Sequence, residues 1–184
     1  GSKRMREVLG DGYVDAVQST WPEIPEATDM VMRWWHRAAQ LARDGQIRRF
    51  GLITTNSLRQ TYVRRAVEPH LAGEPPLSLV FAIPDHPWVD SADGAAVRIS
   101  MTCGESGRME GRLLTVTAEK EGGSSSEQDL VAMITVENGP IHADLSVGVD
   151  VTRAMQLESN LGLCSVGMKT IGAAFQIDRT VAEQ

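Results

Sequence analysis

The stretch at residues 47–60 constrains the fold of this chain more than any other. A short apolar run at residues 50–53 ends in four small polar residues, 54–57, and a helical pattern of apolar residues begins directly after them. This order predicts a buried strand that enters a helix through a tight loop. In open α/β sheets, ligands and substrates bind at the carboxyl ends of such strands. Asn56 and Ser57 are therefore candidates for a substrate cleft, the alternative being an ordinary helix N-cap.

Helical patterns flank this strand on both sides. Upstream, residues 28–44 carry apolar side chains at spacings of three and four, with Thr28 as the expected N-cap and Gly45 as the glycine that ends the helix. Two shorter helices are expected before it. Downstream, a single helix is expected from about Asn56 to Leu71, with one buried stripe. The stripe consists of Leu58, Tyr62, Val63, Ala66 and Val67.

The second half of the chain is predicted to be rich in strands. Residues 77–83 and 95–101 have strand length, and the segments 113–118 and 130–136 alternate like a hairpin pair. In the second of these strands, one apolar face is expected from Val97, Ile99 and Met101. The predicted class is α/β, with one βαβ crossover followed by an antiparallel addition. Because two or three strands seldom complete a doubly wound domain, this order indicates half of a mixed sheet.

The composition is that of a globular protein without a membrane span. Of the 184 residues, 42% are apolar, which is enough for a packed core. No run approaches the about 20 apolar residues of a transmembrane helix. Cys103 and Cys164 are too few and too isolated for a disulfide framework or a metal site, so a reducing, cytoplasmic setting is expected. The net charge of −6 argues against a free-standing nucleic-acid binder, because such proteins are usually basic.

Three runs of sequence resemble one enzyme family. They are Trp-Trp-His-Arg-Ala-Ala at 34–39, Arg-Phe-Gly-Leu-Ile-Thr-Thr-Asn-Ser at 49–57, and Pro-Trp at 87–88 ahead of Ala-Ala-Val-Arg-Ile at 95–99. Together they resemble the large adenine-specific (N6) DNA methyltransferases of restriction-modification systems, in particular single-chain enzymes that join methylation, target recognition and sometimes cleavage. The similarity covers residues 3–104 and continues more weakly through 138–150.

The resemblance implies a partial Rossmann-like methyltransferase sheet. In the family, a seven-stranded mixed sheet binds S-adenosylmethionine through a glycine-rich loop, and an Asn-Pro-Pro-aromatic tetrapeptide holds the extruded adenine. By this resemblance, residues 50–55 are the fifth strand, 77–83 the sixth and 95–101 the antiparallel seventh. Residues 1–111 then correspond to the carboxyl-terminal half of the catalytic domain. Residues 112–184 would be a β-rich extension, beginning with a hairpin, that leads toward a target-recognition region.

The chain departs from the family pattern in two features that the chemistry requires. It contains no Asn-Pro-Pro-aromatic tetrapeptide, and no glycine-rich loop follows a strand near its start. Family members carry the tetrapeptide just before a segment that resembles residues 3–6, so the chain is expected to be a fragment that begins after the catalytic loop. S-adenosylmethionine is then the cofactor of the full-length enzyme. For the fragment alone, no catalytic residue, no cofactor-binding residue, no metal site and no methyl transfer are expected.

Three residues in the long loop expected between the strands at 77–83 and 95–101 are site candidates. By the resemblance, Trp88 is the base-stacking residue, because a methylated base must leave the helical stack and an aromatic plane replaces the lost stacking. The alternative is a packing residue at the sheet edge. Asp85 and His86 are assigned to the substrate cleft, although a turn carboxylate and a surface imidazole are the simpler interpretation of this pair.

Basic residues and partners complete the prediction. Lys3, Arg4, Arg6 and Arg59 are candidates for contacts with DNA phosphates, the alternative being solvated helix faces. Double-stranded DNA is the expected partner of the full-length protein, no membrane is involved, and the fragment is expected to self-associate through exposed sheet edges. Two other functions stay open. One is a non-catalytic α/β interaction module, and the other is a different Rossmann-like enzyme that binds a small ligand at the polar strand end.

Overall fold

The computed structural model describes residues 2–88, 97–121, 130–151, 154–155 and 158–160, which divide into a first unit, 1–152, and a second, 153–184. The described residues of the second unit include one short helix, η3 (Glu158–Asn160). The first unit has the following elements: α1 (Ser2–Leu9), α2 (Asp11–Thr20), α3 (Val31–Arg43), β1 (Arg49–Thr55), η1 (Asn56–Arg59), α4 (Thr61–Arg64), α5 (Glu68–Ala72), β2 (Leu77–Pro87), β3 (Arg98–Ser106), β4 (Gly111–Glu121) and β5 (Leu130–Gly139).

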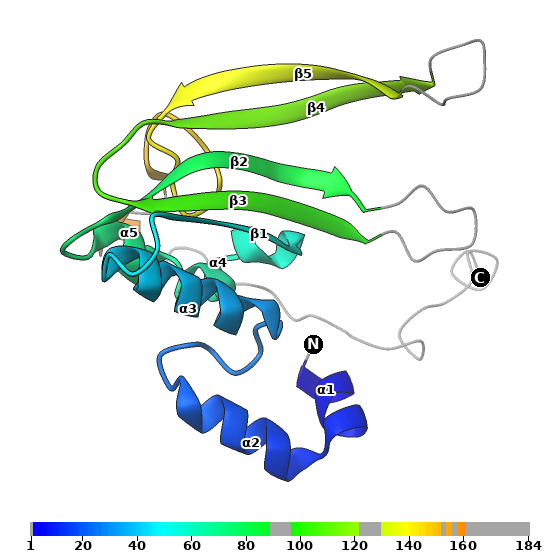
Figure 1. Ribbon diagram of the computed structural model, residues 1–184, viewed down its shortest axis with the longest axis vertical. Helices are drawn as coiled ribbons and strands as arrows, with labels where there is room; N and C mark the ends of the chain where they lie inside the picture. The colour runs from blue at the N-terminus through cyan, green and yellow to red at the C-terminus, as the bar shows by residue number, and fades with distance from the viewer. Residues whose placement is uncertain (1, 89–96, 122–129, 152–153, 156–157, 161–184) are drawn as a thin grey trace. The chain divides into compact units, whose positions relative to one another are not determined.

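The strands of the first unit form one five-stranded mixed sheet in the order β1-β3-β2-β4-β5 (Figure 1). Strand β3 lies antiparallel between β1 and β2, which therefore run in the same direction. Strand β4 joins β2 in parallel at two register pairs, Phe81 with Arg112 and Ala82 with Leu113, and forms an antiparallel hairpin with β5. The predicted α/β class, with a partial Rossmann-like sheet and a β-hairpin extension, is confirmed. Among the described residues, β1 pairs with β3 alone, so β1 is an edge strand.

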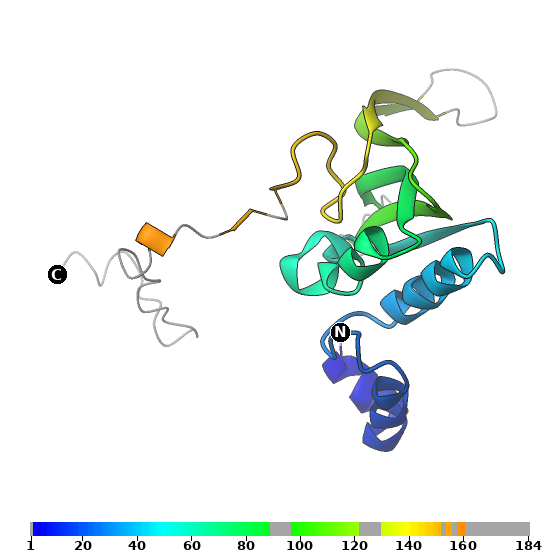
Figure 2. The ribbon, with the colours of Figure 1, turned by 90° about the vertical axis from the view of Figure 1, so that its left-hand side faces the viewer.

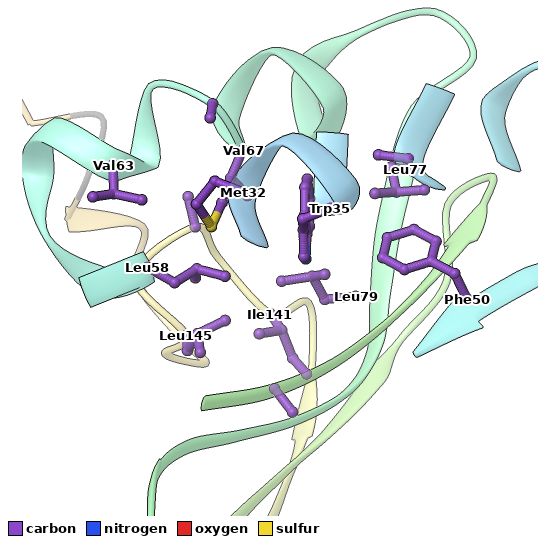
Figure 3. Close-up of a cluster of buried hydrophobic side chains, with 14 of the residues drawn as sticks. Met32, Trp35, Phe50, Leu58, Val63, Val67, Leu77, Leu79, Ile141 and Leu145 are labelled. Atoms are coloured by element: carbon purple, nitrogen blue, oxygen red, sulfur yellow. The ribbon is translucent and has the colours of Figure 1, made fainter. Parts of the chain in front are cut away.

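The core lies between α3 and one face of this sheet (Figures 1 and 2). Trp35 of α3 is fully buried, and its ring packs edge-on against Phe50 of β1, with the ring centroids 5.5 Å apart. Its indole Nε1 donates a hydrogen bond to the Thr102 hydroxyl at 3.0 Å. Figure 3 shows these rings beside the aliphatic side chains of the core. A tryptophan at this depth contributes both a large apolar surface and a satisfied polar group.

The face of β3 that meets the core is made of small residues. Ser100, Thr102 and Gly104 are buried, and a Cβ on Gly104 would lie 2.5 Å from the Phe50 ring. Ile99 and Met101 alternate with these residues and share the opposite face of β3, as predicted, whereas Val97 precedes the strand. Ile99 is buried, Met101 is half-buried and Val97 is 46% exposed. Small side chains occupy the inner face because they leave room for the aromatic rings that reach it from α3 and β1.

Helix α3 has the predicted end but a different beginning. Gly45 has a φ of 72°, its N–H bonds the carbonyl of Ala42, and the N–H of Gln46 bonds that of Leu41. This is the Schellman arrangement that a glycine after a helix permits. The predicted N-cap at Thr28 is wrong, since the helix begins at Val31 and the Thr28 hydroxyl bonds the carbonyl of Pro25 instead.

The single helix predicted for residues 56–71 is also wrong. The segment forms three short helices, η1, α4 and α5, because Gln60 has an extended backbone (ψ 141°) that interrupts the helical path. Four of the five predicted stripe residues are nevertheless buried, and the exception is Tyr62, which is 41% exposed. The apolar pattern therefore identified the side chains that pack on the core. It did not predict that three short helices, rather than one long helix, carry these side chains.

The predicted hairpin is confirmed by β4 and β5, and the chain after it returns to the core. Ile141, Ala143 and Leu145 are buried there, and Ile141 forms an isolated bridge with Val147. Residues 145–150 form no strand. Leu145 has a φ of 57°, a left-handed conformation that is unfavourable for a residue with a branched side chain.

Replacing Gly111 by alanine is expected to destabilise the fold. Gly111 begins strand β4, which lies beside β2. A Cβ at this position would lie 2.1 Å from the backbone oxygen of Leu79 and 2.6 Å from Ile141 Cδ1. Because a backbone oxygen within a sheet cannot move aside, we expect a loss of about 1–3 kcal/mol in the free energy of unfolding, measured in urea. Gly12→Ala is the matched control. It lies in α2 with no atom within 4 Å, so it should be neutral or slightly stabilising.

Candidate functional site

The predicted cleft residues gather at one edge of the sheet. The carboxyl ends of β1 and β2 and the amino end of β3 meet there, because β3 is antiparallel to both neighbours. Asn56 follows β1, Asp85 and His86 lie in the last residues of β2, and Trp88 comes directly after that strand. The structure thus brings together residues that lie about thirty positions apart in the sequence.

Asn56 connects the end of β1 to the end of β2. Its side-chain Nδ2 donates to Asp85 Oδ1 at 2.9 Å, and the Ser100 hydroxyl lies 3.3 Å from its Oδ1 and 2.8 Å from the carbonyl of Pro84. The Arg98 guanidinium forms an ion pair with the same Asp85 carboxylate, and this partner raises the pKa of Arg98. Asn56 therefore does not act as an N-cap. It links strands whose ends form the proposed cleft.

A second polar cluster ties the start of α3 to the same strand end. Asp29 Oδ2 accepts hydrogen bonds from the hydroxyls of Thr55 (2.6 Å) and Ser57 (3.0 Å), which are themselves 2.6 Å apart. Burial by itself raises the pKa of this carboxyl, but the two hydroxyl donors help to bring the pKa below its ordinary value. Ser57 is thus held by Asp29. No sequence pattern predicted the contact of Asp29 with these two hydroxyls.

Trp88 presents its ring to solvent while its backbone is fixed. The side chain is 55% exposed, and its backbone N–H bonds the carbonyl of Val97 at 2.9 Å. Its neighbour His86 is half-buried, with Nδ1 2.5 Å from the carbonyl of Pro87. The exposed ring of Trp88 suits an aromatic contact surface.

An open pocket of about 300 Å³ lies beside this cluster. It is lined by Asn56, Ser57, Arg59, Gln60 and Asp144. The Arg59 Nε donates to the backbone carbonyl of Asp144 at 3.2 Å, so the segment after the hairpin forms one wall. Asp144 lies within residues 138–150, where the family resemblance is weak. No sequence pattern predicted that it lies beside Arg59.

The other predicted phosphate contacts lie on α1. Arg6 forms ion pairs with Asp11 (3.1 Å) and Asp15 (2.8 Å) of α2, and both carboxylates raise its pKa. These pairs fasten the two helices to each other. Lys3 and Arg4 also belong to α1, but their side chains lie outside the described part of the structure. A role for any of the three in binding DNA stays a prediction.

A buried histidine pair lies on the other side of α3. The Nε2 of His70 is 2.9 Å from Nδ1 of His36, whose Nε2 is 2.8 Å from a Glu23 oxygen. Because a carboxylate only accepts, the neutral His36 carries its proton on Nε2, and its Nδ1 accepts from His70 Nε2–H. No group of three metal-binding side chains occurs among the described residues.

Acidification is expected to weaken the fold through this pair. Burial, and then the neighbouring His36 and Arg43, lower the pKa of His70 from 6.5 to about 4. The unfolded chain therefore binds more protons between these two pH values, so stability is complete above pH 6.5 and falls as the pH drops toward 4. His70→Gln should remove part of this slope in urea unfolding measured from pH 7 to pH 4. Equal slopes in both proteins would contradict the assignment.

The chain can also be compared with known proteins. No protein-family model matches the chain, and no curated protein sequence matches it. Among the described residues, no helix is long and apolar enough to cross a membrane. The fold is similar to a solved structure of the Type IIL restriction-modification enzyme MmeI in complex with DNA, with a TM-score of 0.54 and 22% sequence identity. The match covers 76% of this chain and 18% of the enzyme, so this chain shares its fold with a part of a restriction-modification enzyme.

Proposed function

We propose that this chain is the carboxyl-terminal half of the catalytic domain of an adenine-specific DNA methyltransferase from a restriction-modification system. The observation that carries the proposal is the arrangement of three strands. An antiparallel strand lies between two parallel ones, and β1 leaves its other edge unpaired by any described residue. This is what the fifth, seventh and sixth strands of such a domain would look like without the neighbour of the fifth. The fold similarity to part of a DNA-bound restriction-modification enzyme supports it.

A buried arginine gives independent support. Arg33 of α3 is 1% exposed, and none of its guanidinium nitrogens bonds a described residue. Burial lowers its pKa without removing the charge, and a buried charge without a partner is strongly unfavourable. An acidic group supplied by the other half of the domain would relieve this cost.

The described residues do not fit S-adenosylmethionine. None of their glycines lies in a tight loop that leads directly from a strand into a helix, where the backbone would cradle the cofactor. Strand β1 is followed instead by Asn56 and Ser57, whose side chains are already bonded to Asp85 and Asp29. The cofactor and the catalytic tetrapeptide would therefore belong to the preceding half, and this chain alone would not transfer methyl groups.

The contribution of this chain would be to hold the substrate. Trp88 is exposed at the sheet edge, as a stacking surface for an extruded adenine would be. The bonds of Asn56 and Arg98 to Asp85 would keep that surface in a fixed place relative to β1. Positioning of this kind is a large part of catalysis when two reactants must meet in one geometry.

Two experiments test the proposal. The reading frame before Gly1 should encode Asn-Pro-Pro-Tyr or Asn-Pro-Pro-Phe shortly upstream. The protein extended to include that region should transfer radiolabelled methyl groups from S-adenosylmethionine to duplex DNA, whereas the 184-residue chain should not. Turnover by the 184 residues alone would overturn the assignment to half of a catalytic domain. An upstream frame without the tetrapeptide would overturn the proposal in favour of a non-catalytic α/β interaction module.

The open edge of β1 leads to a prediction about assembly. We expect the 184-residue chain to self-associate at high concentration, because an edge strand with unpaired backbone groups pairs readily with another strand. Ile53 is 46% exposed on β1, and its replacement by lysine should reduce this association. Met133→Lys, at an exposed position of the opposite edge strand β5, is the control. Sedimentation velocity measures both, and an effect of Met133→Lys alone would place the contact on β5.

A further inference from the structure

The pocket beside β1 is lined by one cationic side chain, Arg59, whose guanidinium is held by a backbone carbonyl of this chain. Only the Nε of Arg59 is used within the described structure, in the bond to the Asp144 carbonyl. The outer nitrogens of the guanidinium make no hydrogen bond or ion pair there, and both Arg59 and Gln60 are exposed. A guanidinium fixed at Nε presents its outer nitrogens in one direction, which suits the two-point binding of a phosphate.

The wall that fixes Arg59 is a strained turn. Leu145 adopts a φ of 57° although it is not glycine, and its side chain is 2% exposed in the core. The N–H of Leu145 bonds the His142 carbonyl at 2.9 Å, and the N–H of His142 bonds the Ser146 carbonyl at 2.9 Å. A conformation of this kind costs free energy and persists only where the surroundings impose it. Here its effect is to place the Asp144 carbonyl against Arg59.

The carboxylate of Asp144, the acidic side chain of the pocket, is hydrogen-bonded within its own turn. The Asp144 Oδ1 accepts hydrogen bonds from the backbone N–H (3.2 Å) and the hydroxyl (2.6 Å) of Ser146. Its negative charge is thus partly compensated within the turn. Ser57 and Asn56 already donate to carboxylates, so the donors left for a ligand are the outer nitrogens of Arg59 and the exposed amide of Gln60.

We propose that this pocket binds one backbone phosphate of a DNA strand, with Arg59 as the contact and the turn at Asp144 and Leu145 as the element that positions it. The inference rests on the proposed function, which supplies the DNA. A polymer is favoured over a free phosphate because the pocket is open and has a single cation, so that one contact among several is the role it can fill. Trp88, on the same sheet edge, would meet a base of the same strand.

The test is the salt dependence of DNA binding by the extended protein, measured by fluorescence anisotropy with a labelled oligonucleotide duplex and its single strand. Loss of one phosphate contact should lower the slope of log affinity against log salt by about 0.9 for a duplex. We therefore expect this reduction for Arg59→Gln. Arg59→Lys should keep the slope but lower the affinity, because lysine retains the charge and loses the fixed fork. Arg108→Gln, an exposed arginine at the other end of β3, should change neither.

A second variant tests the positioning role of the turn. Leu145→Val keeps an apolar side chain but makes the left-handed backbone less favourable. It should weaken DNA binding when Arg59 is present and have no further effect when Arg59 is glutamine, as a double-mutant cycle detects. If Leu145→Val fails to fold in circular dichroism, the comparison of glutamine and lysine at position 59 still decides the contact.

The outcomes separate this inference from the proposed function. Absence of DNA binding at low salt, or equal slopes for the wild type and Arg59→Gln, would overturn the phosphate site. Competition by inorganic phosphate at constant ionic strength tests the source: we expect none, and full displacement would overturn the assignment to DNA. Binding that depends on Arg59, combined with an extended protein that transfers no methyl groups, would instead overturn the methyltransferase and leave the phosphate site.

Discussion

Replacing Trp88 by alanine is expected to lower kcat/KM for DNA methylation by the extended protein about 5- to 150-fold, since stacking on an aromatic side chain is worth about 1–3 kcal/mol per base. The side chain is 55% exposed and the neighbouring backbone is held by the bond to Val97, so the substitution should remove a contact surface without unfolding the chain. The measurement is initial-rate transfer of radiolabelled methyl groups at varied DNA concentration.

Two matched variants sharpen this test. Trp88→Phe keeps an aromatic plane and should recover most of the activity. Trp34→Ala removes a tryptophan that is 60% exposed on α3, and it should leave methylation unchanged. Stability should hardly differ among the three proteins. Normal kcat/KM in Trp88→Ala would mean that this residue only packs at the sheet edge, while equal losses in Trp88→Ala and Trp34→Ala would indicate a general surface effect.

Replacing Trp35 by alanine should have the largest effect on stability. The side chain is fully buried, contacts the rings of Phe50 and His70, and donates a hydrogen bond to Thr102. Truncation would leave a large cavity and a hydroxyl without its donor, so we expect the free energy of unfolding to fall by about 3–5 kcal/mol. For a domain of marginal stability, this change would unfold a substantial fraction of the molecules.

Urea unfolding followed by far-UV circular dichroism measures this effect. Trp35→Phe retains most of the apolar volume and loses the hydrogen bond, so it should cost distinctly less than alanine. Trp34→Ala, at the exposed neighbouring position of the same helix, should change stability by about 0.5 kcal/mol or less. A small loss in Trp35→Ala would mean that α3 is not the main cover of the sheet.

Much of the fold could be predicted because its signals are local. The apolar run at β1, the glycine at position 45 and the alternation of β4 and β5 each depend on a few neighbouring residues, and each is confirmed. The helix expected over 56–71 failed at Gln60, whose extended backbone no local pattern predicted. The small inner residues of β3 were missed because they are matched to the rings of Trp35 and Phe50, which come from other elements.

In the candidate site, the identities of several residues could likewise be predicted from local sequence, whereas their contacts could not. Residue types and the polar strand end identified Asn56, Ser57, Asp85 and Trp88, and the antiparallel position of β3 brings them to one edge. Their bonding was not predictable. Asp29, Arg98 and Asp144 act on residues that are remote in sequence, and no periodicity records a contact of this kind.

The sequence by itself determined the α/β class and the approximate positions of the strands, because secondary structure and burial follow from patterns that short segments carry. Only the tertiary structure decided that β1 lies at an open edge, that Leu145 takes a left-handed conformation, and that a carbonyl from the far end of the chain holds Arg59. Those outcomes depend on many distant contacts that form together, and the free energy of the whole assembly selects them.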